Sequence, residues 1–163
     1  MVTNIDVTTN TPSLLIGDSS KIENFGFRLS FDNEKVAYHF IDDFAVNATY
    51  ALSCGDDYLN KDSVTSIEIK TQNSFDNTHP AGSSIAEYLL ARPGSMSFNP
   101  GTFQYKSIDE SIYYVNPENI INNNILDFRF KNISPFLGQH KFVVTVSFKS
   151  GRTLSDSTSI RLY

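Results

Sequence analysis

Tryptophan is absent from the 163-residue chain, and cysteine occurs once, as Cys54. A single cysteine excludes an intramolecular disulfide framework and any zinc site built from several thiolates. The three histidines, at positions 39, 79 and 140, are too far apart to form a zinc-ligand motif. No apolar run approaches the roughly 18 residues that a membrane-spanning helix needs. We therefore expect neither a disulfide-stabilised fold, nor a zinc domain, nor a transmembrane helix.

Basic residues are also few, because 13 Lys and Arg stand against 18 Asp and Glu and give a formal net charge of −5. Proteins that bind nucleic acid use Lys and Arg to neutralise phosphates, so nucleic acid is not an expected partner. The chain is nevertheless 40% apolar and contains 13 Phe and 8 Tyr, enough for one hydrophobic core. The length then predicts a single domain over residues 1–163.

Strands are indicated by apolar residues that recur every second position. The clearest case is the C-terminus, where alternation over Lys141–Lys149 resumes after Ser150-Gly151 and continues to Leu162. Gly151 can adopt the positive φ of a tight turn, so these two segments predict a hairpin. A second clear strand, 25–31, places Phe25, Phe27, Leu29 and Phe31 on one face. Further strands are expected at 4–7, 36–41, 47–52, 64–70 and 127–131, and this spacing is typical of an antiparallel β-sandwich of about seven to nine strands.

One short helix is predicted after Ser84. Glu87 follows three residues later, as in a capping box, and Ile85, Tyr88 and Leu89 then fall on one helical face before Pro93 ends the run.

Nucleophilic catalysis would depend on Cys54 with His39 or His79 as its base. No nucleophile motif such as G-x-S-x-G is present, and a lone cysteine is more often a small buried hydrophobe. We therefore expect a protein that is not an enzyme, with a Cys/His hydrolase as the less favoured alternative.

Two sets of residues are candidates for binding. Asp56, Asp57, Asn60 and Asp62 bring together oxygen ligands of the kind that calcium prefers, although they lack the spacing of an EF-hand and are common turn formers. No cofactor is expected, with calcium as the open alternative. The second set consists of Tyr105, Tyr113 and Tyr114, whose rings could stack on a sugar in a carbohydrate-binding module or could be half-buried structural residues.

Several segments resemble an uncharacterised family of Bacteroidetes lipoprotein domains: 47–54, 61–70, 74–77, 79–85 and the last hairpin with Gly151-Arg152-Thr153-Leu154 at its turn. The run from His79 to Ser83, His-Pro-Ala-Gly-Ser, is the most specific of these. The resemblance implies an immunoglobulin-like β-sandwich, export, and anchoring through a lipidated N-terminal cysteine, which this sequence lacks; it implies no activity. The same run also has a purely structural interpretation, because Pro80 disfavours helix at His79 and Gly82 permits a turn.

Composition agrees with export, since the chain contains 20 Ser, 15 Asn and 12 Thr but only 6 Glu. Small uncharged polar side chains suit exposed strands and turns. We expect an outer-membrane lipoprotein whose signal has been removed, or a secreted protein, rather than a cytoplasmic one. The expected function is a non-catalytic binding or structural module. Such a module would recognise a surface protein or glycan through loops at one end of the sandwich, and contact with a membrane would require a lipid anchor absent from this chain.

Overall fold

The computed structural model describes residues 1–8, 12–15, 17–31, 62–94, 103–117, 124–131 and 137–163. In these ranges the chain forms nine strands: β1 (Val2–Asp6), β2 (Ser13–Leu14), β3 (Ser19–Ser20), β4 (Phe25–Ser30), β5 (Val64–Thr71), β6 (Leu89–Pro93), β7 (Ile125–Phe130), β8 (Gly138–Phe148) and β9 (Thr153–Leu162). It also forms one α-helix, α1 (Ile108–Ile112), and the 3-10 helices η1 (Ile22–Asn24), η2 (Ala86–Tyr88) and η4 (Tyr113–Val115).

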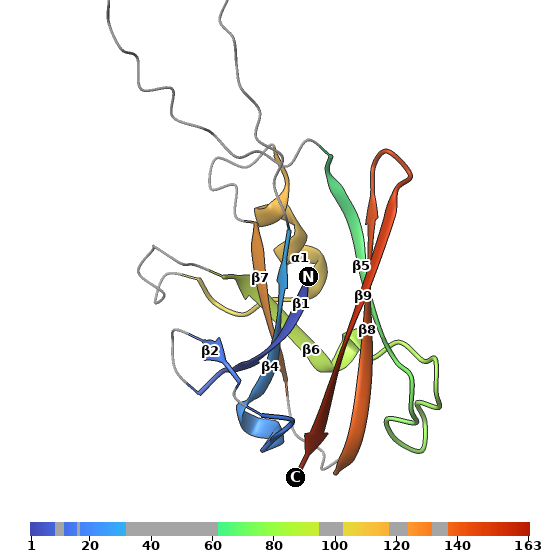
Figure 1. Cartoon of the computed structure of the whole chain (residues 1–163). Helices are drawn as coiled ribbons and strands as arrows, with labels where there is room; N and C mark the ends of the chain where they lie inside the picture. Colours follow the sequence, from blue (N-terminus) through green and yellow to red (C-terminus); the bar gives the residue numbers. More distant parts are fainter. Residues whose placement is uncertain (9–11, 16, 32–61, 95–102, 118–123, 132–136) are drawn as a thin grey trace, which may run out of the picture.

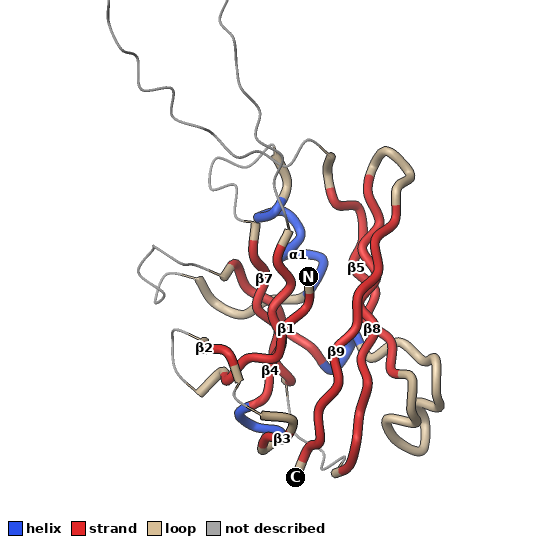
Figure 2. The backbone as a smooth tube through the Cα atoms, in the orientation of Figure 1, coloured by secondary structure: helices blue, strands red, loops and turns tan. Residues whose placement is uncertain are grey.

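The strands form two sheets that pack face to face (Figures 1 and 2). The five-stranded sheet has the order β2-β1-β4-β7-β6, and the four-stranded sheet has the order β3-β9-β8-β5. All neighbouring strands are antiparallel except the short pair β3 and β9, which is parallel. The predicted fold class, a mostly β sandwich with one short helix, is confirmed.

Phenylalanine rings from both sheets form the centre of the core. Phe27 of β4 stacks on Phe128 of β7 with 4.9 Å between ring centroids, and Phe142 of β8 approaches Phe25 at 6.0 Å. All four side chains are fully buried. Because burying an aromatic side chain contributes several kcal/mol, this cluster joins the two sheets without any tryptophan.

The strongest sequence predictions are confirmed. β8 and β9 form the predicted hairpin, Gly151 adopts φ of 87° at its turn, and β4 buries the predicted face. Strands also occur at the predicted positions near 4–7, 64–70 and 127–131. The strands expected at 36–41 and 47–52 lie outside the described residues.

The predicted helix after Ser84 is wrong. Only the single 3-10 turn η2 forms there, and the chain then continues as β6, which pairs with β7 from Leu89 opposite Phe130 to Pro93 opposite Leu126. Apolar residues at 85, 88 and 89 fit a helical face, but burial of Leu89 and Ala91 against the core favours the strand. A different capping box starts the actual helix: Ser107 accepts from the amide of Glu110, and the Glu110 carboxylate accepts from the amide of Ser107.

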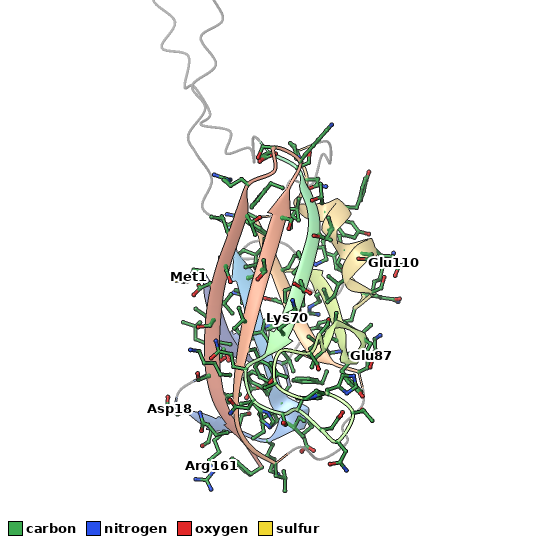
Figure 3. All side chains as sticks on the ribbon, turned by 90° about the vertical axis from the view of Figure 1, so that its right-hand side faces the viewer. Met1, Asp18, Lys70, Glu87, Glu110 and Arg161 are labelled. Carbon is green, nitrogen blue, oxygen red and sulfur yellow. The ribbon has the colours of Figure 1, made fainter. Side chains whose placement is uncertain are left out.

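Each open side of the sandwich is covered by a different structure. On one side α1 packs against β5 and β6. On the other side β1 meets β9 through polar contacts: the amide of Val2 donates to Asp156 Oδ2 at 2.8 Å, and Asn4 Nδ2 donates to the carbonyl of Ser159 at 3.0 Å. Figure 3 shows this arrangement with Met1 beside β9 and Glu110 of α1 beyond β5. None of the helices in the described part of the chain is long and apolar enough to cross a membrane.

Candidate functional site

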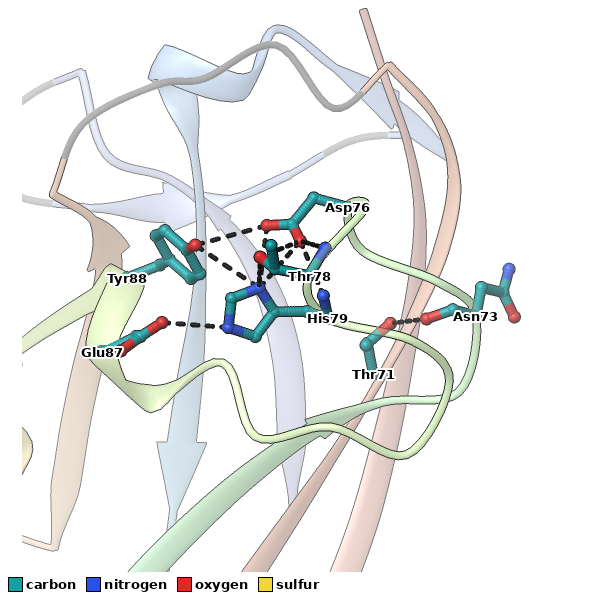
Figure 4. A network of polar contacts seen from close by, with 7 residues as sticks. All are labelled: Thr71, Asn73, Asp76, Thr78, His79, Glu87 and Tyr88. Atoms are coloured by element: carbon teal, nitrogen blue, oxygen red, sulfur yellow. Dashed lines mark hydrogen bonds and ion pairs between the residues drawn. The ribbon is translucent and has the colours of Figure 1, made fainter.

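The loop between β5 and η2 contains the His-Pro-Ala-Gly-Ser run and a compact polar network, drawn in Figure 4. Asp76 organises the loop, since its Oδ1 accepts from the amides of Thr78 and His79, each at 2.7 Å, and from the hydroxyl of Thr78. This is the Asx-turn chemistry that lets a short carboxylate replace a backbone acceptor. Gly82 adopts φ of 87° and donates its amide to the carbonyl of Thr71, which returns the chain to the sheet.

His79 lies between two carboxylates. Its Nδ1 is 2.8 Å and 2.9 Å from the two carboxylate oxygens of Asp76, and its Nε2 is 2.9 Å from Glu87 Oε1. The hydroxyl of Tyr88 donates to Asp76 Oδ2 at 3.3 Å, and the Tyr88 ring packs edge-on against the imidazole at 5.1 Å. Both ring nitrogens therefore have a carboxylate partner.

The charges of this network reinforce one another. The hydrogen bond to Asp76 raises the pKa of His79, burial opposes this shift, and Glu87 adds to it. Burial raises the pKa of Asp76, but the hydrogen bonds from Thr78 and His79 together outweigh burial and hold this pKa well below its usual range. Because both ring nitrogens face carboxylate oxygens, the geometry favours the protonated imidazole over the neutral one.

The network is also poorly arranged for a metal. Asp76 and Glu87 approach opposite nitrogens of the ring, so their oxygens do not converge on one point with an imidazole nitrogen. Across the described ranges, no group of three or more His, Cys, Asp or Glu side chains is placed to hold a metal ion. The observed contacts of His79 are therefore explained by a structural role of this loop, as in the structural interpretation of the His79–Ser83 run given above.

A second cluster lies on the outer face of the five-stranded sheet, and we call it the arginine face: Arg28, Arg92, Asp127, Arg129 and Tyr105. The strand register places Asp127 of β7 between Arg28 of β4 and Arg92 of β6. Arg28 holds the carboxylate with two bonds, Nε to Oδ1 at 2.6 Å and Nη2 to Oδ2 at 3.0 Å. Only 1% of the Asp127 side chain is exposed, so this is a buried ion pair.

Tyr105 covers this cluster. Its neighbour Lys106 pairs with Ala91 at the edge of β6, which brings the tyrosine onto the sheet. The Tyr105 ring lies 4.6 Å from the guanidinium carbon of Arg92 and 4.1 Å from that of Arg129. Its hydroxyl is buried without a hydrogen-bond partner in the described structure, and burial raises the pKa of this phenol.

The other two predicted tyrosines lie in η4. Tyr113 is 61% exposed, and its ring meets Tyr114 edge-on at 5.7 Å. Tyr114 also contacts Phe103 at 5.6 Å. The structure therefore brings Tyr113 and Tyr114 together, whereas Tyr105, two residues after Phe103, joins the arginine face.

The predicted calcium ligands are only partly described. Asp62 uses both carboxylate oxygens within the protein, since they accept from the amide and the hydroxyl of Ser150 in the β8–β9 turn. Asp56, Asp57 and Asn60 lie outside the described residues, as do His39 and Cys54. Calcium binding therefore remains a prediction.

Sequence reasoning missed the arginine face. Alternation in β4 does place Arg28 on the outer face, but the charged partners belong to strands far apart in the chain.

His140 proved to be a core residue, 4% exposed and stacked on Phe142 at 5.8 Å.

Comparison with known protein families gives one match, to "Domain of unknown function (DUF5034)", over residues 2–159. The chain belongs to this family. No curated protein matches this DUF5034 domain. Among solved structures it is similar to chains titled "BspA_C_WT" (TM-score 0.33, 10% identity, 98% of this chain and 49% of that one) and "BspA_C_mut" (0.34, 11%, 99% and 46%).

A third similar structure is the "Streptococcus agalactiae AgI/II polypeptide BspA C terminal domain (WT)", with a TM-score of 0.32 and 10% identity over 99% of this chain and 49% of that one. The DUF5034 domain thus spans about half the length of the solved chains that it matches. At these TM-scores the likeness carries no argument about fold or function.

Proposed function

We propose that this DUF5034 domain is a non-catalytic binding module, exported either to the cell envelope as a Bacteroidetes outer-membrane lipoprotein or into the medium. The observation that carries the non-catalytic part is the position of His79 between two carboxylates. A general base needs a nitrogen with a free lone pair near neutral pH, and both nitrogens of His79 face carboxylates. A thiolate partner such as Cys54 would have to displace one of those carboxylates.

The proposed partner is a surface protein or glycan that contacts loops at one end of the sandwich. The β8–β9 turn supports this proposal because hydrogen bonds to the segment before β5 hold it in place. The carboxylate of Asp62 accepts from the amide of Ser150, and the amide of Lys149 donates to the carbonyl of Ser63. Figure 1 draws this turn and the helical residues that follow α1 toward the same end of the molecule. Rigid strands that support loops are a common arrangement for recognition.

A carbohydrate-binding module is the second candidate, and the exposure of Tyr113 favours it. Its ring is held edge-on by Tyr114, and Tyr114 contacts Phe103 in turn. A tyrosine with a fixed orientation and an exposed face can stack on the apolar side of a sugar ring at little cost in side-chain entropy.

The test is a glycan array and an envelope-extract capture assay with the whole chain, comparing the wild type with Tyr113→Ala. We expect a specific ligand for the wild type, and weaker glycan binding for Tyr113→Ala if the sugar candidate is correct. Tyr163→Ala is the matched control, because Tyr163 is also 61% exposed but lies at the end of β9. Ester or thioester turnover that is lost in Cys54→Ala would contradict a non-catalytic function.

Localisation is tested separately, by fractionating native cells with an antibody against this domain. A lipoprotein is expected in the outer-membrane fraction, and a secreted protein in the medium. Recovery in the cytoplasmic fraction alone would contradict export.

A further inference from the structure

The arginine face concentrates positive charge on a protein whose net charge is −5. Three guanidinium groups, those of Arg28, Arg92 and Arg129, are gathered around one carboxylate, Asp127. Arg28 already occupies both oxygens of that carboxylate. The carboxylate of Asp127 is therefore engaged by Arg28 rather than by Arg129.

Arg129 is the accessible member of the cluster. It is exposed, whereas Arg92 and Asp127 are buried. In the described part of the chain no carboxylate pairs with Arg129, and its contact is the ring of Tyr105 at 4.1 Å. Because the planar guanidinium fork fits a carboxylate, sulfate or phosphate oxygen pair, Arg129 can receive an anionic group from solvent.

The Tyr105 hydroxyl is a second, independent observation that points to a ligand. It is buried and has no hydrogen-bond partner within the described ranges, and a buried hydroxyl without a partner is costly. Its ring also lies against the guanidinium groups of Arg92 and Arg129. An oxyanion beside this ring would accept from the hydroxyl.

We propose that the arginine face binds the carboxylate or sulfate group of an acidic saccharide, with Arg129 and Tyr105 as the contacting residues and Arg92 as a supporting charge. This inference rests on the proposed binding function and names its ligand class. The buried ion pair between Arg28 and Asp127 joins β4 to β7 and so supports the strand that carries Arg129.

Aromatic residues beside the cluster favour a sugar over a phosphopeptide. Phe103 and Tyr105 are two residues apart, which corresponds to roughly 7 Å along an extended chain. From Phe103 a row of ring contacts leads through Tyr114 to the exposed Tyr113. Aromatic rings close in sequence to the anionic contact suit a chain of saccharide units with charged substituents and apolar ring faces.

The experiment is isothermal titration of the full chain with four probes: a galacturonate hexamer, a sulfated heparin hexasaccharide, neutral maltohexaose and a phosphoserine hexapeptide. We expect binding of one or both acidic saccharides, at least about tenfold weaker in Arg129→Gln and weakened by added salt. The carboxylated and sulfated probes distinguish the two sources of the anion. Tyr105→Phe keeps the ring and removes the unpartnered hydroxyl, so it is expected to fold at least as stably and to bind several-fold more weakly.

Arg161→Gln is the matched control, because Arg161 is also exposed but belongs to β9 of the four-stranded sheet, away from the β8–β9 turn. Equal binding of acidic saccharides by wild type and Arg129→Gln would overturn the proposal, as would tighter binding of the phosphopeptide or no binding of either acidic probe. A neutral glycan or protein partner that Arg129→Gln retains would overturn the anion site and leave the proposed binding function intact. Absence of any partner in the array, the capture assay and the titrations would overturn both.

Discussion

The two outer faces of this sandwich bear ion pairs of the same kind in very different surroundings. On the four-stranded sheet, Glu68 and Lys70 lie 2.9 Å apart with nearly half of each side chain exposed. On the five-stranded sheet, Arg28 and Asp127 are 2.6 Å apart with 14% and 1% exposed. Water screens the first pair and not the second, so only the second is expected to matter for stability. An outward-facing residue in a strand is therefore not always a surface residue.

The largest effect is expected for Asp127→Asn. Loss of the carboxylate leaves Arg28 without its buried counter-charge, and the free energy of unfolding should fall by about 3–5 kcal/mol. Urea denaturation measures this change.

The double variant Arg28→Met with Asp127→Leu refines the comparison, because it removes both charges and keeps similar volume. It should recover a large part of the lost stability. A double variant as unstable as Asp127→Asn would show that packing, rather than the uncompensated charge, dominates this face.

The next largest effect is expected for Gly26→Ala, on the outer face of β4. A Cβ at this position would lie 2.3 Å from the carbonyl oxygen of Phe128 and 2.5 Å from Cγ1 of Val7, so the strands would have to separate. We expect a loss of about 1–3 kcal/mol, seen as a lower melting temperature. Ser155→Ala on the exposed face of β9 is the control, and an unchanged melting temperature for Gly26→Ala would contradict the close approach.

A smaller, pH-dependent effect is expected for His79. Its pKa is raised in the folded state, so its stabilising contribution is complete below the unfolded pKa of about 6.5 and is lost as pH rises through the folded pKa. The pKa of Asp76 is lowered, so its contribution is present above about 3.9 and is lost as pH falls through the folded pKa. The network should therefore stabilise the loop most between about pH 4 and 6.5.

Melting temperature followed from pH 5 to 8 in the wild type and in His79→Gln tests this prediction. The wild type should lose stability over the upper part of this range relative to the variant. If the melting temperatures of the wild type and His79→Gln change in parallel from pH 5 to 8, titration of His79 does not contribute to stability in this range, and the prediction is wrong.

The smallest effect is expected for Glu68→Gln on the four-stranded sheet. Because the pair with Lys70 is exposed, the free energy of unfolding should change by about 0.5 kcal/mol or less and should respond weakly to salt. A loss comparable to that of Asp127→Asn would remove the distinction between the two faces.

Most of the fold could be predicted from local alternation. The strands β4, β8 and β9 have long apolar faces with a period of two, and Gly151 marks the turn between β8 and β9. The segment after Ser84 could not be assigned in this way, because Ile85, Tyr88 and Leu89 fit a helix as well as the observed turn and strand. Pairing with β7, which is distant in sequence, decides between them.

The candidate sites were predicted less completely, since each depends on contacts between distant segments. Tyr105 was a candidate from its residue type alone, whereas its arginine neighbours come from β6 and β7 through the pairing of Lys106 with Ala91. Glu87 was assigned to a helix cap and instead binds His79. The turn at Gly82 was a local signal that the sequence of this loop carries directly, and the Asx turn at Asp76 is another.

The seam between β1 and β9 joins residues 154 positions apart, Val2 and Asp156. At about 5–20 residues per second, a ribosome needs roughly 8–30 seconds to make the chain between them. β1 is therefore synthesised well before β9, whereas its pairing partner β4 is available much earlier. Contacts of such high sequence separation are those that make β-rich domains fold slowly.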